Sequence, residues 1–340
     1  MTEEYKRLRT ILVGVGGRGR WPVELLSDDP RFAPVALVDV VPEHLAWARE
    51  RSGLPESACF QDLDTALRQT DATAVIICTP TRTHARFIRS AVRAGRHVLV
   101  EKGMTLDWNE ARLLVHEARA AGVCFCVSQN YRYSAEVRTL QQALTSGRYG
   151  TPYLIDLIHH RHRPEPRTLD YPGAMVWDMA CHHFDNLVFL FGPVARATAV
   201  TYNAPWSAYP YDAGVSAVLE FASGPVCTFV LTHQATVSSY RWVLQSERGA
   251  LQTTAGGSWE WVPRGEVRQF APAGPPEPVP SAPPFRSEQG VLDDWYRYIR
   301  EGVEPGISGR QNLETLATCE MVLRSAALRR AVERTELEES

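Results

Sequence analysis

The chain has 340 residues, with 36 Lys and Arg against 39 Asp and Glu, and a formal net charge of −3. Its 44% hydrophobic content excludes a disordered chain, and its near balance of charge argues against a protein whose main task is to bind nucleic acid. Apolar runs such as 74–78 are far shorter than the roughly 20 residues that span a bilayer, so we expect no membrane segment.

Residues 1–130 alternate between short β-branched runs and helical stretches. Helices are expected at 42–52 and 83–94, and the second is followed by Gly95, a typical helix-ending residue. Strands alternating with helices predict βαβ units and a doubly wound parallel sheet. The expected strands are 10–15, 34–38, 74–78, 97–100 and 123–127.

After about residue 130 the pattern changes to strands separated by Gly, Pro and Ser. Together they indicate a large, mostly antiparallel sheet in an α/β domain, so we predict domains at 1–130 and 131–340. The Pro-rich stretch 271–285 is expected to be a loop. The expected strands are 153–159, 195–202, 215–221, 226–232 and 240–245, and the helices are 134–146, 174–191, 286–301 and 309–335.

A glycine-rich turn follows the first expected strand and precedes a helix. Gly14 permits a tight turn, Gly16 lets the backbone approach a pyrophosphate, and Gly19 lets helix and strand pack closely. Asp39 ends the second strand about 20 residues later, where a carboxylate binds the ribose hydroxyls and repels a 2′-phosphate. We therefore predict a dinucleotide site that favours NAD over NADP. Its loop residues are Gly14, Gly16, Gly17, Arg18 and Gly19, and Arg18 could add positive charge for either dinucleotide.

Several longer segments resemble the Gfo/Idh/MocA oxidoreductases, a family that includes glucose-fructose oxidoreductase and inositol dehydrogenase. The segments are 78–84, 94–102, 130–133, 173–192 and 323–327. The resemblance implies a Rossmann domain joined to an α/β domain with a large open sheet. The face of that sheet often mediates oligomerisation, which implies a homodimer or homotetramer.

The resemblance also implies where the cofactor and substrate meet. The family has a Glu-Lys-Pro motif, and here Glu101 and Lys102 are followed by Gly103, which can adopt unusual backbone conformations. By resemblance, Lys102 lies beside the nicotinamide and stabilises an alkoxide-like oxygen. Its position directly after a buried strand supports this independently, because doubly wound sheets bind ligands at that edge. The resemblance adds Thr79, Pro80, His84 and Glu101 to the cofactor-binding residues.

Asp178, His182 and Asp185 fall within an arc of roughly 60° on an otherwise apolar helix, and His183 points away from them. Buried ionisable groups must pair or face a wet pocket. The stripe resembles the family pattern Asp-x-Gly-x-His-x-x-Asp, with Ala180 in place of Gly. By resemblance, His182 is the general acid/base and Asp178 positions the substrate or tunes the proton relay. The alternative is a structural His–Asp pair, and of the three Asp185 is the one that we expect to be structural.

The basic run 159–163 follows a strand, so its side chains alternate between two faces. His160 and His162 would share one face, but no nearby Cys or Glu completes a metal-ligand spacing, so we predict no metal site. We interpret His160, Arg161 or Arg163 as substrate-recognising, with a solvated basic face as an equal alternative. An Arg that reaches the pocket would indicate a carboxylate or phosphate on the substrate.

Aromatic residues near these motifs could contact a sugar-like ring, although aromatic side chains are as often plain core. The predicted substrate contacts are Tyr131, Arg132, His160, Arg161, Tyr171 and Trp177.

The motifs together predict an NAD(P)-dependent oxidoreductase that acts on a secondary hydroxyl, or the matching ketone, of a sugar, cyclitol or sugar derivative. One alternative is a glycoside-cleaving enzyme that uses tightly bound NAD through transient oxidation. Another is a non-catalytic dinucleotide-binding protein. Residues 1–6 are polar and lack the apolar stretch of a secretory signal, and the seven cysteines contain no C-x-x-C pair. We therefore expect reduced thiols and a cytoplasmic protein.

Overall fold

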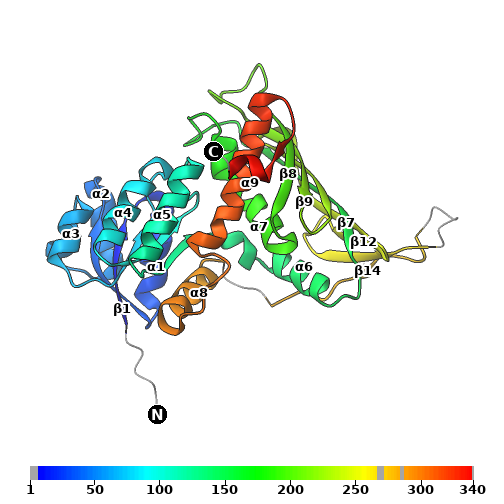
Figure 1. The fold of residues 1–340 in the computed structure, drawn as a ribbon. Helices are drawn as coiled ribbons and strands as arrows, with labels where there is room; N and C mark the ends of the chain where they lie inside the picture. The colour runs from blue at the N-terminus through cyan, green and yellow to red at the C-terminus, as the bar shows by residue number, and fades with distance from the viewer. Residues whose placement is uncertain (1–6, 266–271, 284–286, 339–340) are drawn as a thin grey trace, which may run out of the picture. The chain divides into compact units, whose positions relative to one another are not determined.

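The computed structural model describes residues 7–265, 272–283 and 287–338, and the chain divides into two compact units (Figure 1). The first unit contains residues 1–130 and 288–313, and the second contains 131–287 and 314–340. The division at 130/131 coincides with the predicted domain boundary, whereas 288–313 joins the first unit instead of the second. The polar stretch 1–6 and parts of the predicted Pro-rich loop, residues 271 and 284–285, lie outside the described residues.

The first unit contains a six-stranded parallel sheet, which confirms the predicted doubly wound arrangement. The strand order is β3-β2-β1-β4-β5-β6. The side chains of Ile11, Val75 and Leu99 on three central strands are 0% exposed, as expected when helices cover both faces of a parallel sheet. The strands are β1 (Leu8–Val13), β2 (Phe32–Val38), β3 (Cys59–Phe60), β4 (Ala74–Ile77), β5 (His97–Glu101) and β6 (Phe125–Ser128).

The helices of this unit form two packed groups. The first group joins α1 to α2, and the second joins α4 to both α3 and α5. Asp62 and Asp107 cap α3 and α5 by accepting backbone N–H groups of the first turn. The helices are α1 (Arg20–Asp28), α2 (Pro42–Ser52), α3 (Leu63–Gln69), α4 (His84–Arg93) and α5 (Trp108–Ala120).

Helix α8 (Ser287–Glu301) explains why 288–313 belongs to the first unit. The fully buried ring of Trp295 stacks on Phe32, with 6.1 Å between ring centroids. Arg31 forms ion pairs with both Asp29 and Asp293. The Phe32–Trp295 and Arg31–Asp293 contacts join residues more than 250 positions apart, so no local pattern could have predicted them.

The second unit contains a nine-stranded sheet in the order β14-β13-β12-β11-β7-β10-β9-β8-β15. Every adjacent pair is antiparallel except β7 and β10, which confirms the predicted mostly antiparallel sheet. The predicted strands are present, and four short strands (β12 to β15) were not predicted. The strands are β7 (Pro152–His162), β8 (Val194–Tyr202), β9 (Gly214–Phe221), β10 (Val226–Thr232), β11 (Gln234–Ser246), β12 (Gly249–Thr253), β13 (Trp259–Pro263), β14 (Glu277–Pro278) and β15 (Val332–Glu333).

Helices cover one face of this sheet and leave the other open. Helix α6 (Ala135–Thr145), a π-helix (Met175–Ala180) that continues into α7 (Cys181–Phe191), and most of α9 (Gly309–Leu328) belong to this unit. Phe184 of α7 packs on Phe229 of β10, with 4.9 Å between ring centroids. On the opposite face, which we call the open face, Val200 and Val218 are 56% and 40% exposed. No described helix is long and apolar enough to cross a membrane.

The predicted closing helix 309–335 is too long, because α9 ends at Leu328 and the chain then forms β15 beside β8. Arg329 adopts a positive φ of 54°, which breaks the helical path. The hydroxyl of Ser325 donates to the carbonyl of Arg330 and accepts the backbone N–H of Ala199. These contacts hold the residues after α9 against the sheet.

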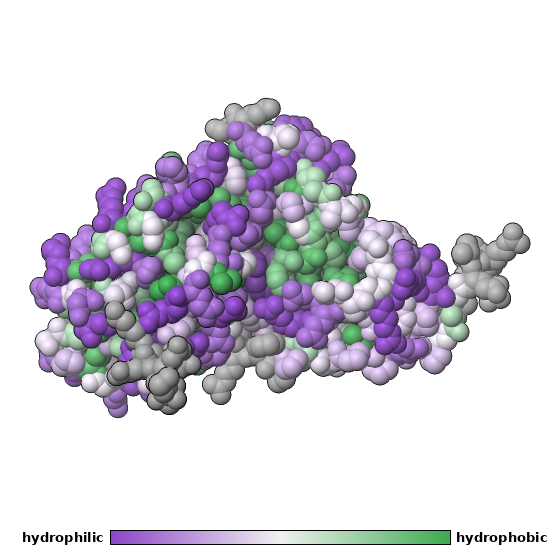
Figure 2. All heavy atoms as spheres, turned by 60° about the horizontal axis from the view of Figure 1, so that its bottom comes forward, coloured by the Kyte–Doolittle hydropathy of each residue, from purple (hydrophilic) through white to green (hydrophobic). Residues whose placement is uncertain are grey.

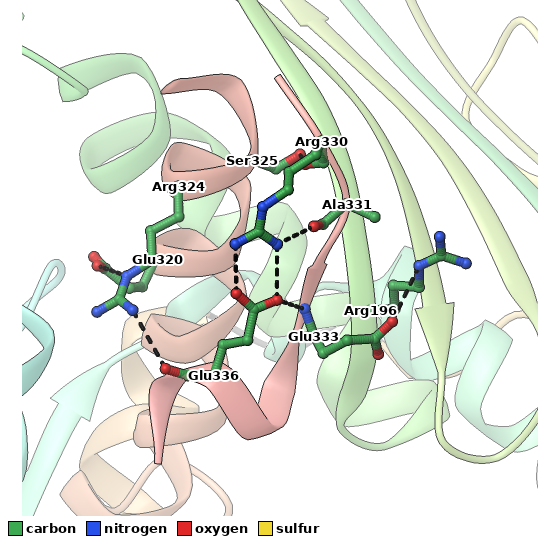
Figure 3. A network of polar contacts seen from close by, with 8 residues as sticks. All are labelled: Arg196, Glu320, Arg324, Ser325, Arg330, Ala331, Glu333 and Glu336. Carbon is green, nitrogen blue, oxygen red and sulfur yellow. Dashed lines mark hydrogen bonds and ion pairs between the residues drawn. The ribbon is translucent and has the colours of Figure 1, made fainter. Parts of the chain in front are cut away.

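A polar network fixes the segment that follows (Figure 3). Arg330 donates to both carboxylate oxygens of Glu336, which also accepts the backbone N–H of Glu333. Arg196 of β8 forms an ion pair with Glu333, and Arg324 of α9 donates to the carbonyl of Glu336. The network joins the end of α9, β15 and β8.

We expect the network to weaken in acid. Hydrogen bonding from Arg330 lowers the pKa of Glu336 from 4.5 to about 2. A carboxyl with a lowered folded-state pKa stabilises the fold above its unfolded-state pKa, and this contribution is lost as the pH falls towards the folded-state value. Glu336→Gln should therefore lower Tm at pH 7, with a gap from wild type that narrows below pH 4.5. Thermal melts across pH 7 to 3, with Glu338→Gln as control, measure this gap, and a pH-independent gap would contradict the assignment.

Candidate active site

The glycine turn after β1 is shaped by contacts that exclude side chains. Gly14 has a φ of +76°, and a Cβ there would lie 2.8 Å from the carbonyl oxygen of Cys78. A Cβ at Gly19 would lie 1.6 Å from the carbonyl oxygen of Gly14. At Gly17, whose φ is +50°, the Cβ position has no heavy atom within 4 Å. The turn is therefore tightly packed on its inner side and open at Gly17, which fits the approach of a dinucleotide pyrophosphate to the backbone.

Asp39 follows β2 with its carboxylate fixed by backbone donors. One oxygen accepts the N–H of Val15 and the other accepts the N–H of Val41, each at 2.9 Å. The side chain is only 9% exposed. Each carboxylate oxygen can accept more than one hydrogen bond, so the group can also bind ribose hydroxyls as predicted.

His44 is a residue that the sequence reasoning missed. Its Nδ1 lies 3.2 Å from Asp39, and its ring fills the space that a Cβ on Gly16 would need. Its position could have been found from Pro42, which begins α2 and places residue 44 on the first turn beside the end of β2. His44 is thus a further candidate contact for the cofactor.

The end of β5 carries a buried carboxylate with three hydrogen-bond donors. Glu101 accepts the indole N–H of Trp21 at 2.9 Å and the Nε of Arg18 at 3.0 Å. Arg18 also forms an ion pair with Glu288 at 2.7 Å. The backbone N–H of Lys102 donates to the other Glu101 oxygen. Both predicted cofactor residues, Arg18 and Glu101, are therefore held in one polar cluster next to Lys102.

His84 joins the turn after β4 to the segment after Lys102. Its Nδ1 lies 2.7 Å from the carbonyl oxygen of Gly103, and its Nε2 lies 2.8 Å from that of Thr79. The peptide bond between Lys102 and Gly103 is cis. The His84 ring is fully buried, so its observed contacts position backbone.

The predicted cofactor residues of the first unit therefore gather at the carboxyl ends of adjacent strands. Strands β2, β1, β4 and β5 are neighbours in the parallel sheet. Each is followed by one of the predicted groups: Asp39, the glycine turn, Thr79 and Pro80, and Lys102. This edge is where doubly wound sheets bind their ligands.

In the second unit, Asp178 and His182 each contact a tyrosine. The hydroxyl of Tyr171 donates to Asp178 at 2.6 Å. Tyr131 stacks on His182, with 4.0 Å between ring centroids and 11° between the planes. The prediction of a regular α-helix is wrong here, because Asp178 lies in the π-helix, whose turns contain more residues, so the calculated arc does not hold. Tyr171 and Tyr131 were both predicted to contact the substrate, and they lie directly against Asp178 and His182.

Asp185 forms a buried ion pair. Its carboxylate accepts two hydrogen bonds from the guanidinium of Arg132 and one from the hydroxyl of Thr315. The side chains of Asp185 and Arg132 are 1% and 5% exposed. These contacts agree with the expected structural role of Asp185, and they give Arg132 a structural partner, while its contact with substrate stays a prediction. Trp177 is also buried, at 4% exposure.

His183 points towards the sheet. Its Nε2 lies 2.9 Å from Nδ1 of His159 on β7. Burial lowers the pKa of His159 to about 4 and that of His183 well below its usual value, so both are neutral at pH 7. The structure does not bring His160 to this side, because alternation along β7 places it on the open face, near Ser239. Arg161 lies on the same side of the strand as His159. The described residues contain no group of three or more side chains that could hold a metal ion.

Two protein-family models match this chain. "Oxidoreductase family, NAD-binding Rossmann fold" matches residues 8–129, and "GFO/IDH/MocA C-terminal domain" matches residues 137–252. The chain belongs to the Gfo/Idh/MocA oxidoreductases. The predicted family, the NAD cofactor and the enzyme class are thereby confirmed: the protein is an NAD-binding oxidoreductase.

Relatives match along almost the whole chain. A D-apiose dehydrogenase of Paraburkholderia graminis is 27% identical over 99% of this chain and 92% of its own. An inositol 2-dehydrogenase of Rhizobium meliloti is 26% identical over 94% of this chain and 97% of its own. An oxidoreductase of Agrobacterium radiobacter, solved with NAD+, L-tartaric acid and magnesium, is 17% identical, with a TM-score of 0.83 over 98% of this chain and 100% of its own. This last likeness shows the fold.

Removing Arg132 should destabilise the protein strongly. Arg132→Met would leave Asp185 charged and buried without its main partner, which typically costs about 3–5 kcal/mol of unfolding free energy. Urea unfolding of the variant measures the loss. Arg297→Met, which removes an exposed ion pair with Glu301, is the control and should change stability by less than about 1 kcal/mol. Equal losses of unfolding free energy in the two variants would show that the buried pair stabilises the fold no more than an exposed pair does.

Proposed function

We propose that the protein is an NAD-dependent dehydrogenase that acts on a secondary hydroxyl, or the matching ketone, of a sugar or cyclitol. The observation that carries this proposal is the pair Asp178 and His182 on one buried helical segment, each with a tyrosine against it. A proton-accepting imidazole next to hydroxyl and ring groups suits the oxidation of an alcohol.

The predicted cofactor residues would hold NAD in the first unit: the glycine turn, Asp39 and the groups that end β4 and β5. NAD, when bound, supplies the acceptor for the hydride that leaves the substrate carbon. His182 accepts the hydroxyl proton during oxidation and returns it during reduction. Asp178, hydrogen-bonded to Tyr171, orients a substrate hydroxyl, and Lys102 stabilises the negative charge that develops on the reacting oxygen.

The relatives support the substrate class. Two that match over nine-tenths or more of both chains are named for D-apiose and inositol, which are polyhydroxylated compounds. Tyr131 and Tyr171 can offer a ring face and a hydroxyl to such a compound. Preference for NAD over NADP is supported by Asp39, whose charge repels a 2′-phosphate.

A homo-oligomer formed through the open face is part of the proposal. Register places Val200, Val230 and Ile158 in one row across the sheet. Figure 2 shows hydrophobic side chains gathered over part of the molecule and bordered by hydrophilic ones. Apolar patches of this kind usually mark contact surfaces. We also place the protein in the cytoplasm, supported by seven cysteines that are all free thiols.

Replacing the proposed acid/base should greatly reduce turnover and leave cofactor binding nearly unchanged. His182→Ala removes the proton acceptor, and general acid–base groups typically contribute a factor of about 10²–10⁴ to rate. We expect kcat to fall by that factor while the Kd for NADH, measured by fluorescence, changes by less than about twofold. His116→Ala, an exposed change on α5, is the control. Wild-type turnover in His182→Ala would remove the residue from the mechanism.

Replacing Asp39 should change cofactor preference. Asp39→Ser removes charge-assisted hydrogen bonds, which should weaken NAD binding about 10- to 100-fold, and removes the repulsion of a 2′-phosphate. The ratio of kcat/KM for NAD to that for NADP should fall accordingly. Glu43→Ser, a neighbouring exposed carboxylate on α2, should leave the ratio unchanged. If Asp39→Ser also leaves it unchanged, Asp39 does not bind the ribose.

A further inference from the structure

Two half-buried arginines at the end of β7 have no ion-pair partner in the parts of the chain that the structure describes. Arg161 lies on the same side of the strand as His159, which contacts α7, and Arg163 follows two residues later on that side. Most other arginines of this unit pair with a carboxylate, as Arg132 does with Asp185. A half-buried guanidinium without a carboxylate is unfavourable unless something else satisfies it.

The backbone that carries these arginines is held rigidly. The N–H of Arg163 donates to the carbonyl of His233 at 2.9 Å. The hydroxyl of Tyr209 lies 3.1 Å from the carbonyl oxygen of Arg163 and 2.9 Å from Nδ1 of His233. Tyr209 and His233 are 4% and 0% exposed. The guanidinium groups therefore start from a fixed backbone, as a binding site requires.

The positive charge at this place is not neutralised by the groups around it. Burial lowers the pKa of Arg163, and so does repulsion from the positive charges of Arg161 and Arg167. The neighbouring imidazoles stay neutral, because burial lowers the pKa of His233 to about 3 and that of His159 to about 4. Guanidinium groups remain charged in proteins, so the cluster keeps a net positive charge at pH 7.

The cluster lies beside the proposed catalytic residues. Nη1 of Arg163 is 4.0 Å from the sulfur of Met179, the residue that follows Asp178. Tyr131, whose ring stacks on His182, is among the groups that act electrostatically on Arg163. A substrate that reaches His182 would therefore lie near the guanidinium of Arg163, which belongs to the same unit.

We propose that the natural substrate carries an anionic group, a carboxylate or a phosphate, that Arg163 binds together with Arg161. The proposal rests on the proposed function and refines its substrate class from a neutral polyol to an acidic one. A guanidinium binds either group through two parallel hydrogen bonds, which fixes orientation as well as affinity. The anion would position the rest of the substrate for His182.

The test compares neutral sugars with their acidic forms by calorimetry on the NADH-saturated protein, without turnover. The probes are D-glucose and D-galactose, their uronates and their 6-phosphates, so that the two acidic arms separate carboxylate from phosphate. We expect at least one acidic form to bind at least tenfold more tightly than its neutral parent. Arg163→Met should remove this preference, and Arg163→Lys should keep part of it. Arg68→Met, an exposed change on α3, should keep all of it.

Two outcomes would overturn the proposal: no acidic probe binds more tightly than its parent, or the preference survives Arg163→Met. If that variant does not fold, as judged by its melting curve, Arg161→Met gives the same comparison. Failure of the proposed function would look different, because acidic probes would bind through Arg163 while no bound probe reduced NAD. If a neutral sugar is turned over and acidic probes bind no more tightly than neutral ones, only the proposal of an anionic substrate is rejected, and the proposed dehydrogenase function stands.

Discussion

The arrangement of the second unit depends on the buried ion pair between Arg132 and Asp185. Its two partners lie 53 residues apart, and each lies within three positions of a residue of the proposed site. Tyr131 precedes Arg132 and stacks on His182, which lies one helical turn before Asp185. The ion pair and the ring stack therefore join the same two segments, 131–132 and 182–185. A buried pair is costly to break, so it holds the stacked ring in register with the imidazole.

The same constraint explains why a π-helix precedes α7. Asp185 is fixed by Arg132 and Thr315, and His183 is fixed against His159 on the sheet, so the helix cannot rotate at these positions. The wider turn at Met175–Ala180 instead lets Asp178 meet the hydroxyl of Tyr171. Segments of this kind often occur at functional sites, where a side chain must be directed differently from its neighbours on a regular helix.

Sequence predicted what depends on local patterns, and missed what depends on distant partners. The strands of the first unit follow from buried β-branched runs, and the glycine turn follows from the spacing of its glycines, although Cys78 and His44, which pack against it, are distant in sequence. By contrast, α8 joins the first unit through Phe32 and Trp295, and α9 ends where Ser325 meets Ala199. His160 was assigned to the substrate because it lies in a basic run, but strand alternation sends it to the open face. Only the register of β7 against its neighbours decides which members of that run share a side with α7.

The two units treat charge in different ways, and the difference bears on what each one binds. In the first unit the carboxylates of Asp39 and Glu101 accept hydrogen bonds from backbone N–H groups, an indole and Arg18. In the second unit Asp185 is balanced by Arg132, whereas Arg161 and Arg163 keep their charge on a backbone fixed by Tyr209 and His233. A fixed but unbalanced charge is of use mainly to a ligand of opposite sign, because the cost of holding it apart from water is recovered only when that ligand binds. The fold therefore places two half-buried arginines that form no ion pair, among the residues described, beside the helical segment that leads to His182.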